Sequence, residues 1–253
     1  MKVAVCIKQV PTREWQPRLN ESKTWIREAD ASFEMNEPDA YALEEGLRLR
    51  ERHGGEVVVC AAGPARVAQV VREALARGAD RAIHVEDDAL ASADAFVTAD
   101  ALAEAMREDG FDLVLTGLQS DDQGHAQVGV ILAERLGMPH ATIIMDVQVE
   151  DGRLRVKREL EGGWFQWVGL PLPALLTIQS GINQLRYATL KGIMAAKKKE
   201  IRRVVPASRA EARQSIATMY IPEKTKRTEM LQGTPADAAA ELVRRLRDEA
   251  RVL

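Results

Sequence analysis

Apolar residues gather in short runs that alternate along the chain with segments of helical periodicity. The run from Glu56 to Ala62 is continuous, apolar and rich in β-branched residues, which is typical of a strand buried on both faces. The segment from Asp39 to His53 instead places Leu43 and Leu47 one helical turn apart. Strands that alternate with helices predict an α/β fold with a doubly wound, mostly parallel sheet.

The same pattern predicts most of the remaining elements. The predicted buried strands are 2–10, 56–62, 81–85, 111–116 and 174–179, and the predicted helices are 39–53, 65–77, 94–108 and one that ends at 136. Alternating segments at 141–149, 153–159 and 164–170, separated by Asp151-Gly152 and Gly162-Gly163, predict antiparallel additions to the sheet. Residues 13–34 are polar with scattered aromatics and predict a long loop or a small hairpin.

From Val204 onward the pattern changes. We expect a linker with a short amphipathic helix within 204–216, an apolar plug at 219–222 and a basic segment at 224–227. Thr234 followed by Pro235 is a strong helix start, and the helix should run almost to the end of the chain, near Val252. This tail has no core of its own, so it must pack on the rest of the chain or on another protein.

Composition narrows the class of protein. Apolar residues make up 46% of the chain and aromatic residues only 4%, so the core must be built from aliphatic side chains. The net charge of −3 gives no support for nucleic-acid binding. Cys6 and Cys60 both lie in apolar runs and are expected to be buried thiols, and no metal-ligand cluster is evident. The first residues are too short an apolar run for a signal peptide or a membrane span, which predicts a cytoplasmic protein.

The best candidate for a ligand site follows the predicted strand 111–116. Residues 117–129 form a loop bounded by glycines that leads into a helix, whose free N–H groups and dipole favour an anion. The alternative is that Ser120 or Asp121 caps the helix and nothing binds. The residues alone support these two interpretations equally. The loop is neither a Walker loop nor GxGxxG, which disfavours phosphate transfer. His125 has no nucleophile or acid–base partner evident beside it, so we expect no enzyme.

A second candidate surface follows the predicted strand 174–179. Leu190 is an apolar residue in an exposed-looking segment, and from Lys191 to Arg203 there are six Lys or Arg against one Glu. An apolar side chain flanked by cations is typical of a protein-docking surface. The residues alone favour the simpler interpretation, in which Leu190 packs on its own domain and the lysines are solvated.

Residues 156–201 carry a specific set of matches to a known family. The matching residues are Arg158, Glu159, Glu161, Gly162, Gly163, Pro173, Ala174, Leu176, Thr177, Asn183, Arg186, Tyr187, Ala188, Thr189, Leu190, Ala196 and Lys197. In this order and spacing they resemble the signature region of the electron-transfer flavoprotein (ETF) β subunit, and the resemblance extends over essentially the whole chain. One departure is Leu185, where the family usually has a proline that would stiffen the loop.

The resemblance implies an electron carrier subunit rather than an enzyme. Such a β subunit pairs with an α subunit that holds most of a redox-active FAD, accepts electrons from dehydrogenases and passes them on, with an ETF-quinone oxidoreductase-type protein as one acceptor. It also implies an adenine-nucleotide α-hydrolase-like, Rossmann-like sheet with an extended C-terminal arm. The implied division is a nucleotide-binding domain at 1–183, a partner-recognition loop and basic segment at 184–203, and an arm at 204–253 that packs on the α subunit.

The resemblance also implies a bound nucleotide and its contacts. AMP would be held by Cys6, Asn36, Glu37, Pro38, Asp39, Ala62, Gly63, Gly117, Gln119, Ser120, Asp122, Gly124, His125, Ala126, Gln127, Val128 and Gly129. Thr12 and Arg13 match the place where the β subunit approaches the flavin, although the family often has Tyr there. Tyr187, Leu190, Ile193, Met194, Lys197 and Lys198 would contact a partner dehydrogenase, which reverses the simpler interpretation of Leu190.

Three alternatives to this function differ in testable features. Electron-bifurcating members hold a second FAD in place of AMP, and their loop typically reads Asp-Gly-Asp-Thr-Ala-Gln-Val-Gly. This chain keeps Asp122 and the final Ala126 to Gly129 but lacks the second Asp and the Thr, which favours AMP. A stand-alone AMP- or ATP-binding regulator would not need so long an arm. An adenylating ligase would need a Ser-Gly-Gly-x-Asp-Ser loop after the first strand, and residues 9–12 do not resemble one.

Overall fold

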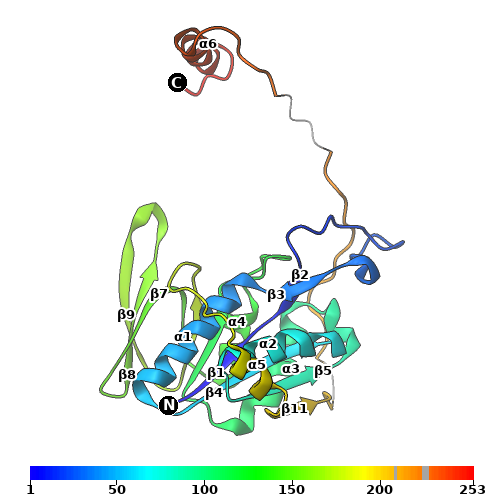
Figure 1. Cartoon of the computed structure of the whole chain (residues 1–253), viewed down its shortest axis with the longest axis vertical. Helices are drawn as coiled ribbons and strands as arrows, with labels where there is room; N and C mark the ends of the chain where they lie inside the picture. The colour runs from blue at the N-terminus through cyan, green and yellow to red at the C-terminus, as the bar shows by residue number, and fades with distance from the viewer. Residues whose placement is uncertain (208–209, 224–227) are drawn as a thin grey trace. The chain divides into compact units, whose positions relative to one another are not determined.

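The computed structural model describes residues 1–207, 210–223 and 228–253, which form two compact units, Met1–Met219 and Tyr220–Leu253 (Figure 1). The strands of the main sheet are β1 Lys2–Cys6, β4 Glu56–Gly63, β5 Arg81–Glu86, β6 Leu113–Gly117, β7 His140–Glu150, β8 Arg153–Glu159, β9 Phe165–Pro171, β10 Ala174–Ile178 and β11 Ile201–Val204. They form one nine-stranded sheet in the order β11-β5-β4-β1-β6-β10-β7-β8-β9. Neighbours from β11 to β7 are parallel, whereas β7, β8 and β9 pair antiparallel. The predicted fold class, a doubly wound mostly parallel sheet with antiparallel additions, is confirmed.

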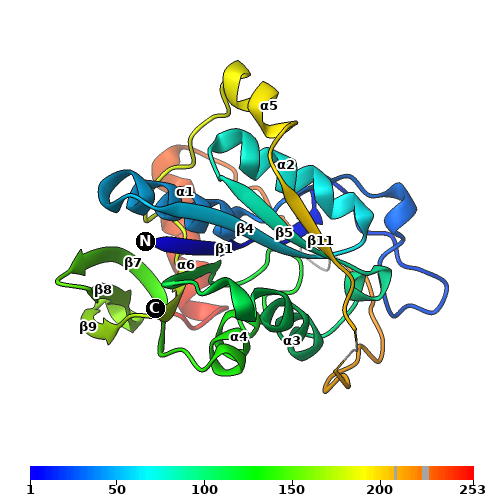
Figure 2. The ribbon, with the colours of Figure 1, turned by 90° about the horizontal axis from the view of Figure 1, so that it is seen from below.

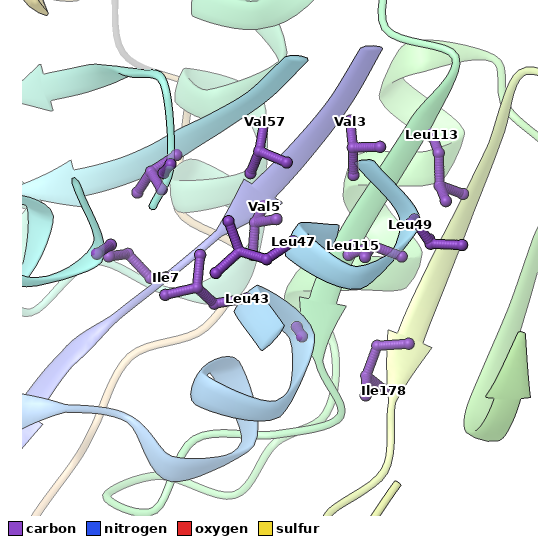
Figure 3. Close-up of a cluster of buried hydrophobic side chains, with 14 of the residues drawn as sticks. Val3, Val5, Ile7, Leu43, Leu47, Leu49, Val57, Leu113, Leu115 and Ile178 are labelled. Carbon is purple, nitrogen blue, oxygen red and sulfur yellow. The ribbon is translucent and has the colours of Figure 1, made fainter. Parts of the chain in front are cut away.

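Helices cover both faces of the sheet because the strand side chains alternate between two apolar layers. The helices of the first unit are α1 Glu37–His53, α2 Ala68–Arg77, α3 Ala95–Met106, α4 Val128–Leu136 and α5 Leu190–Ala196. Figure 2 shows α1 and α2 on one face and α3 and α4 on the other. The core under α1 joins Leu43 and Leu47 to Val3, Val5 and other strand residues, as Figure 3 shows. The opposite core contains both cysteines, which are free and buried as expected.

The first predicted strand is interrupted, which corrects the prediction of one strand over 2–10. β1 ends at Cys6, and residues Gln9–Pro11 form a separate strand, β2, that pairs antiparallel with β3, Phe33–Met35. Between β1 and β2, the backbone N–H of Lys8 donates to the carboxylate of Asp39, at 2.7 Å, instead of to a neighbouring strand. The stretch 13–34 contains an isolated bridge and a short 3-10 turn, in agreement with the predicted loop or small hairpin.

The sequence did not predict two elements after β10. Leu190–Ala196 forms a short helix, α5, and Ile201–Val204 forms β11, which pairs parallel with β5 at the edge of the sheet. The amphipathic helix predicted within 204–216 is wrong for the described residues 205–207 and 210–216, which have no helix. Residues 208 and 209, and the predicted basic segment at 224–227, lie outside the described residues.

The second unit contains the predicted C-terminal helix, α6, Pro235–Asp248. Thr234 and Asp237 form a capping box, in which the Thr234 hydroxyl accepts from the Asp237 N–H and the Asp237 carboxylate accepts from the Thr234 N–H. The helix ends at Asp248, four residues before the predicted end. Among the described residues, no helix is both long and apolar enough to span a membrane.

Candidate functional site

The candidate cavity lies at the carboxyl ends of β1 and β6. From β1 the chain builds the sheet in one direction through β4 and β5, and then crosses back to β6 on the other side of β1. This change of direction leaves a crevice where parallel α/β sheets bind ligands. The empty space within it, including space at its mouth that is open to solvent, is about 880 Å³. Its walls come from strand ends, the start of α1, the loop 117–127 and the first turn of α4.

Asp39, in the first turn of α1, joins the two strand ends beneath this cavity. One carboxylate oxygen accepts from the Lys8 N–H at 2.7 Å, and the other accepts from the Gly117 N–H at 2.9 Å. Burial raises the pKa of Asp39 to about 7, although the N–H groups of Lys8 and Gly117 and the side chain of Asn36 act to lower it. Asp39 therefore links the crevice to α1.

Asn36 precedes α1 and holds the loop that follows β6. Its side-chain amide donates to the carbonyl of Gln119 at 3.0 Å, and its side-chain oxygen accepts from the Asp121 N–H at 2.9 Å. Asn36 directly precedes α1, but its side chain makes no capping hydrogen bond to that helix. It organises the neighbouring loop instead.

Lys8 extends from the end of β1 across the same loop. Its ammonium lies 2.7 Å from the Asp122 carboxylate and 3.3 Å from both the Ser120 hydroxyl and the Gln123 side-chain oxygen. Lys8 lines the cavity, yet sequence reasoning missed it because it lay inside the predicted strand. A lysine near the carboxyl end of an apolar strand was the signal that could have identified it.

Close backbone approach explains the glycines that bound the loop. A Cβ on Gly117 would lie 2.4 Å from the Asp39 carboxylate, and one on Gly129 would lie 2.7 Å from the Thr116 hydroxyl. Both positions are therefore closed to larger residues unless the loop or α4 moves. The start of α4 thus lies directly against the strand ends.

The structure brings most of the predicted nucleotide residues together around this cavity. Those that line it are Cys6, Asn36, Asp39, Ala62, Gly117, Gln119, Ser120, His125, Ala126, Gln127, Val128 and Gly129. Glu37, Pro38, Gly63, Asp122 and Gly124 do not line it, although Asp122 reaches it through Lys8. Lining residues that the sequence did not single out are Ile7, Lys8, Leu90, Ala91, Ala93, Ala95, Thr98, Leu102, Thr116, Leu118 and Gln123. The cavity therefore has a polar side at the loop and an aliphatic side at α3 and the turn before it.

Thr12 and Arg13 follow β2 beside the start of α1. The Thr12 N–H donates to the carbonyl of Ser32 at 2.9 Å, and the Arg13 guanidinium pairs with Glu37 and lies 3.5 Å from Asp121. Arg13 is thus connected to the loop that carries the cavity's polar groups. Neither residue lines the cavity itself.

The predicted partner-binding residues lie on and just before α5. Tyr187 is 90% exposed and Leu190 84% exposed, so the interpretation in which Leu190 packs on its own domain is wrong for this chain. Ile193, Met194, Lys197 and Lys198 are also exposed, whereas Ala196 is buried. The result is an apolar surface beside exposed cations.

Comparisons with known proteins agree over nearly the whole chain. The family model described as the electron transfer flavoprotein domain matches residues 24–208. A protein of Methylophilus methylotrophus is 38% identical over 96% of this chain and 97% of its own length. Similar proteins of Thermoanaerobacterium thermosaccharolyticum and Bacillus subtilis are 36% and 35% identical, over 97% and 90% of this chain and 98% and 91% of their own lengths. All three relatives are named electron transfer flavoprotein subunit beta.

Proposed function

The chain belongs to the electron transfer flavoprotein β-subunit family, and from this premise we propose that it pairs with an α subunit, accepts electrons from dehydrogenases and passes them on. Members of the family are electron carriers rather than catalysts of bond-making reactions. In the proposed heterodimer the α subunit holds most of the FAD, and Thr12 and Arg13 of this chain lie near it. An ETF-quinone oxidoreductase-type protein is a proposed acceptor.

The single observation that most supports a nucleotide in this subunit is the crevice at the ends of β1 and β6. Its polar side offers the N–H groups at the start of α4 and the Lys8 ammonium to a phosphate. Its aliphatic side, which includes Leu90 and Leu102, suits the flat face of a base. We propose AMP as the ligand, because the loop lacks the second Asp and the Thr typical of members with a second FAD. AMP would supply no redox chemistry here and would order the loop and strand ends.

We assign dehydrogenase docking to α5 and its flanks. Leu190 is the proposed anchor, with Tyr187, Ile193 and Met194 around it and Lys197 and Lys198 as steering charges. A buried apolar anchor carries much of the energy of such a contact, and flanking cations speed the encounter with an acidic partner. The arm from residue 204 onward would pack on the α subunit.

Ligand analysis of the purified complex tests the nucleotide assignment. The chain is expressed with its companion subunit, purified and extracted, and flavin and adenine nucleotides are measured per mole of heterodimer. We expect one FAD and one AMP. Two FAD and no AMP would identify the bifurcating alternative, and a nucleotide-loaded monomer that never binds a companion would support the stand-alone regulator.

Leu190→Ala tests the docking assignment. Loss of an exposed anchor should slow reduction by the dehydrogenase about 30-fold at subsaturating concentration, which corresponds to about 2 kcal/mol. FAD and AMP content should stay unchanged, because Leu190 is not one of the residues that line the cavity. Leu160→Ala, at another exposed leucine, is the matched control. An unchanged rate in the Leu190 variant would contradict the assignment.

A further inference from the structure

α5 is too short to be stable as an isolated helix. It has seven residues and contains a glycine, whereas isolated helices shorter than about 12–15 residues are marginal in water. At its start the Thr189 hydroxyl accepts from the Gly192 N–H at 3.0 Å, which is an ordinary N-cap. Only Ala196 is buried within the helix. Its conformation must therefore depend on contacts with other elements.

Two cations, Arg72 and Lys199, connect α2 with the C-terminal end of α5. Arg72 of α2 donates to the carbonyls of Ala196 and Lys199, at 2.6 and 2.9 Å. In return, the Lys199 ammonium donates to the carbonyl of Leu75, at 3.1 Å, and to that of Ala79. Burial lowers the pKa of Lys199, with Asp80 acting in the opposite direction. Arg72 of α2 thus binds carbonyls at and just after the end of α5, and Lys199, which follows α5, binds carbonyls at and just after the end of α2.

Gly192 brings the backbones of the two helices into direct contact. Figure 2 shows α5 beside α2, and a Cβ on Gly192 would lie 2.2 Å from the carbonyl oxygen of Ala76. An ordinary carbon–oxygen contact is longer by at least about 1 Å, so alanine there would push α5 away from α2. Alanine would otherwise favour the helix, because its intrinsic propensity exceeds that of glycine.

The segment before α5 is anchored to α1. The Arg186 guanidinium donates to Glu44 at 2.9 and 3.1 Å and also pairs with Glu51. The Asn183 side chain donates to the Tyr41 carbonyl at 3.1 Å and to Glu45 at 3.2 Å. α5 is therefore held from α1 on its N-terminal side and from α2 along its length and at its end.

We propose that Arg72, Gly192 and Lys199 are positioning residues that hold α5 in its docking geometry before a partner arrives. This inference rests on the proposed function of α5. It divides the basic run into two parts, because Lys197 and Lys198 are exposed to a partner while Lys199 belongs to the scaffold. A docking surface that is already ordered loses less conformational entropy on binding, which increases affinity without any new contact.

Two variants displace α5 by different means. Gly192→Ala adds the obstructing methyl group, and Arg72→Met removes the cap while retaining an unbranched side chain at an exposed position. Arg72→Lys is the rescue variant, since a lysine can still donate to carbonyls. Arg107→Met is the matched control, because Arg107 also donates to a helix-end carbonyl, that of Arg135 on α4, and Figure 2 shows α4 on the opposite face of the sheet from α2 and α5.

The assay uses the FAD-loaded heterodimer and measures dehydrogenase-dependent reduction over a range of dehydrogenase concentrations. We expect KM for the dehydrogenase to rise about 5- to 10-fold in Gly192→Ala and Arg72→Met, with kcat unchanged, because the docking step alone is weakened. Amide hydrogen exchange of residues 190–199 should accelerate in the same variants. Arg72→Lys should recover most of the affinity, and Arg107→Met should match the wild type.

The outcomes separate this inference from the function on which it rests. Leu190→Ala is measured alongside. If Leu190→Ala weakens docking while Gly192→Ala and Arg72→Met leave KM and exchange unchanged, the positioning role is overturned and the docking assignment stands. If none of the three affects KM, the docking assignment itself falls. A control as impaired as Arg72→Met would also overturn the positioning role.

Discussion

Asp39→Asn should change the pH dependence of stability in a direction that burial dictates. The carboxyl is buried, and two backbone N–H groups donate to it. Burial raises the pKa of Asp39 from an ordinary 3.8 to about 7 in the folded chain. Across this interval the folded state retains a proton that the unfolded state has lost, so the stability that the neutral carboxyl contributes is present below pH 3.8 and is lost as the pH rises towards 7.

The size of the effect follows from the same two pKa values. Each pH unit between them is worth about 1.4 kcal/mol, so the full interval corresponds to about 4 kcal/mol. Asparagine is uncharged throughout. The free energy of unfolding of Asp39→Asn should therefore rise by about 2–3 kcal/mol relative to the wild type between pH 5 and pH 8, and the difference should level off above pH 7.

Urea unfolding of the two proteins at pH 5, 6, 7 and 8 measures this difference. Asp94→Asn is the matched control, because Asp94 accepts backbone N–H groups at a more exposed site and its pKa is lowered. Its effect on stability should be flat from pH 5 to pH 8. If the difference between wild type and Asp39→Asn is equally flat, the carboxyl is charged throughout and the reasoning from burial is refuted.

Two further substitutions test the packing around the crevice and the ion pairs that anchor the proposed docking segment. Gly129→Ala should cost about 1–3 kcal/mol and reduce bound nucleotide per mole, because the new methyl group meets Thr116 at 2.7 Å; Gly169→Ala, which meets nothing within 4 Å, should leave both unchanged. Arg186→Met should cost about 1–3 kcal/mol at pH 7, because it removes a partner of the buried Glu44 carboxylate. Burial acts to raise the pKa of Glu44, but its arginine partners outweigh burial and hold the pKa below 4.5. The cost of the substitution should therefore shrink as the pH falls below 4.5 and Glu44 becomes protonated. A cost that is the same at pH 7 and pH 4 would contradict this.

The sequence predicted the parallel core and its covering helices because those elements depend on local pattern. Strands such as β4 and β6 are apolar throughout, which reports burial on both faces, and α1 has the helical spacing of a one-sided contact. The resemblance then assigned residues from four separate segments to one site, and most of them line one cavity. Reasoning from the residues alone could not do this, because it gave equal support to two interpretations of the loop 117–129, a helix cap with no ligand and an anion-binding site.

The elements that were missed depend on distant partners. α5 requires Arg72 from α2, and no local pattern reports a cap supplied from so far along the chain. β11 is four residues long with two arginines, too short for alternation to be recognised. The helix expected within 204–216 is absent from the described residues of that segment. There the N–H groups of Arg213 and Gln214 donate to the Asp94 carboxylate and not to carbonyls of a helical turn. The end of β1 was missed because Asp39 takes the N–H of Lys8.

α1 carries Asp39 in its first turn and Glu51 near its last, about 18 Å apart at 1.5 Å per residue. The proposed nucleotide site and the anchor of the segment before α5 therefore lie on the same helix. Helical geometry fixes the distance and the angle between them. Inserting a single residue between Asp39 and Glu51 would rotate one side chain about the helix axis by about 100° relative to the other. We therefore expect natural variants of α1 to differ by substitutions, and insertions or deletions to occur only in the loops before and after the helix.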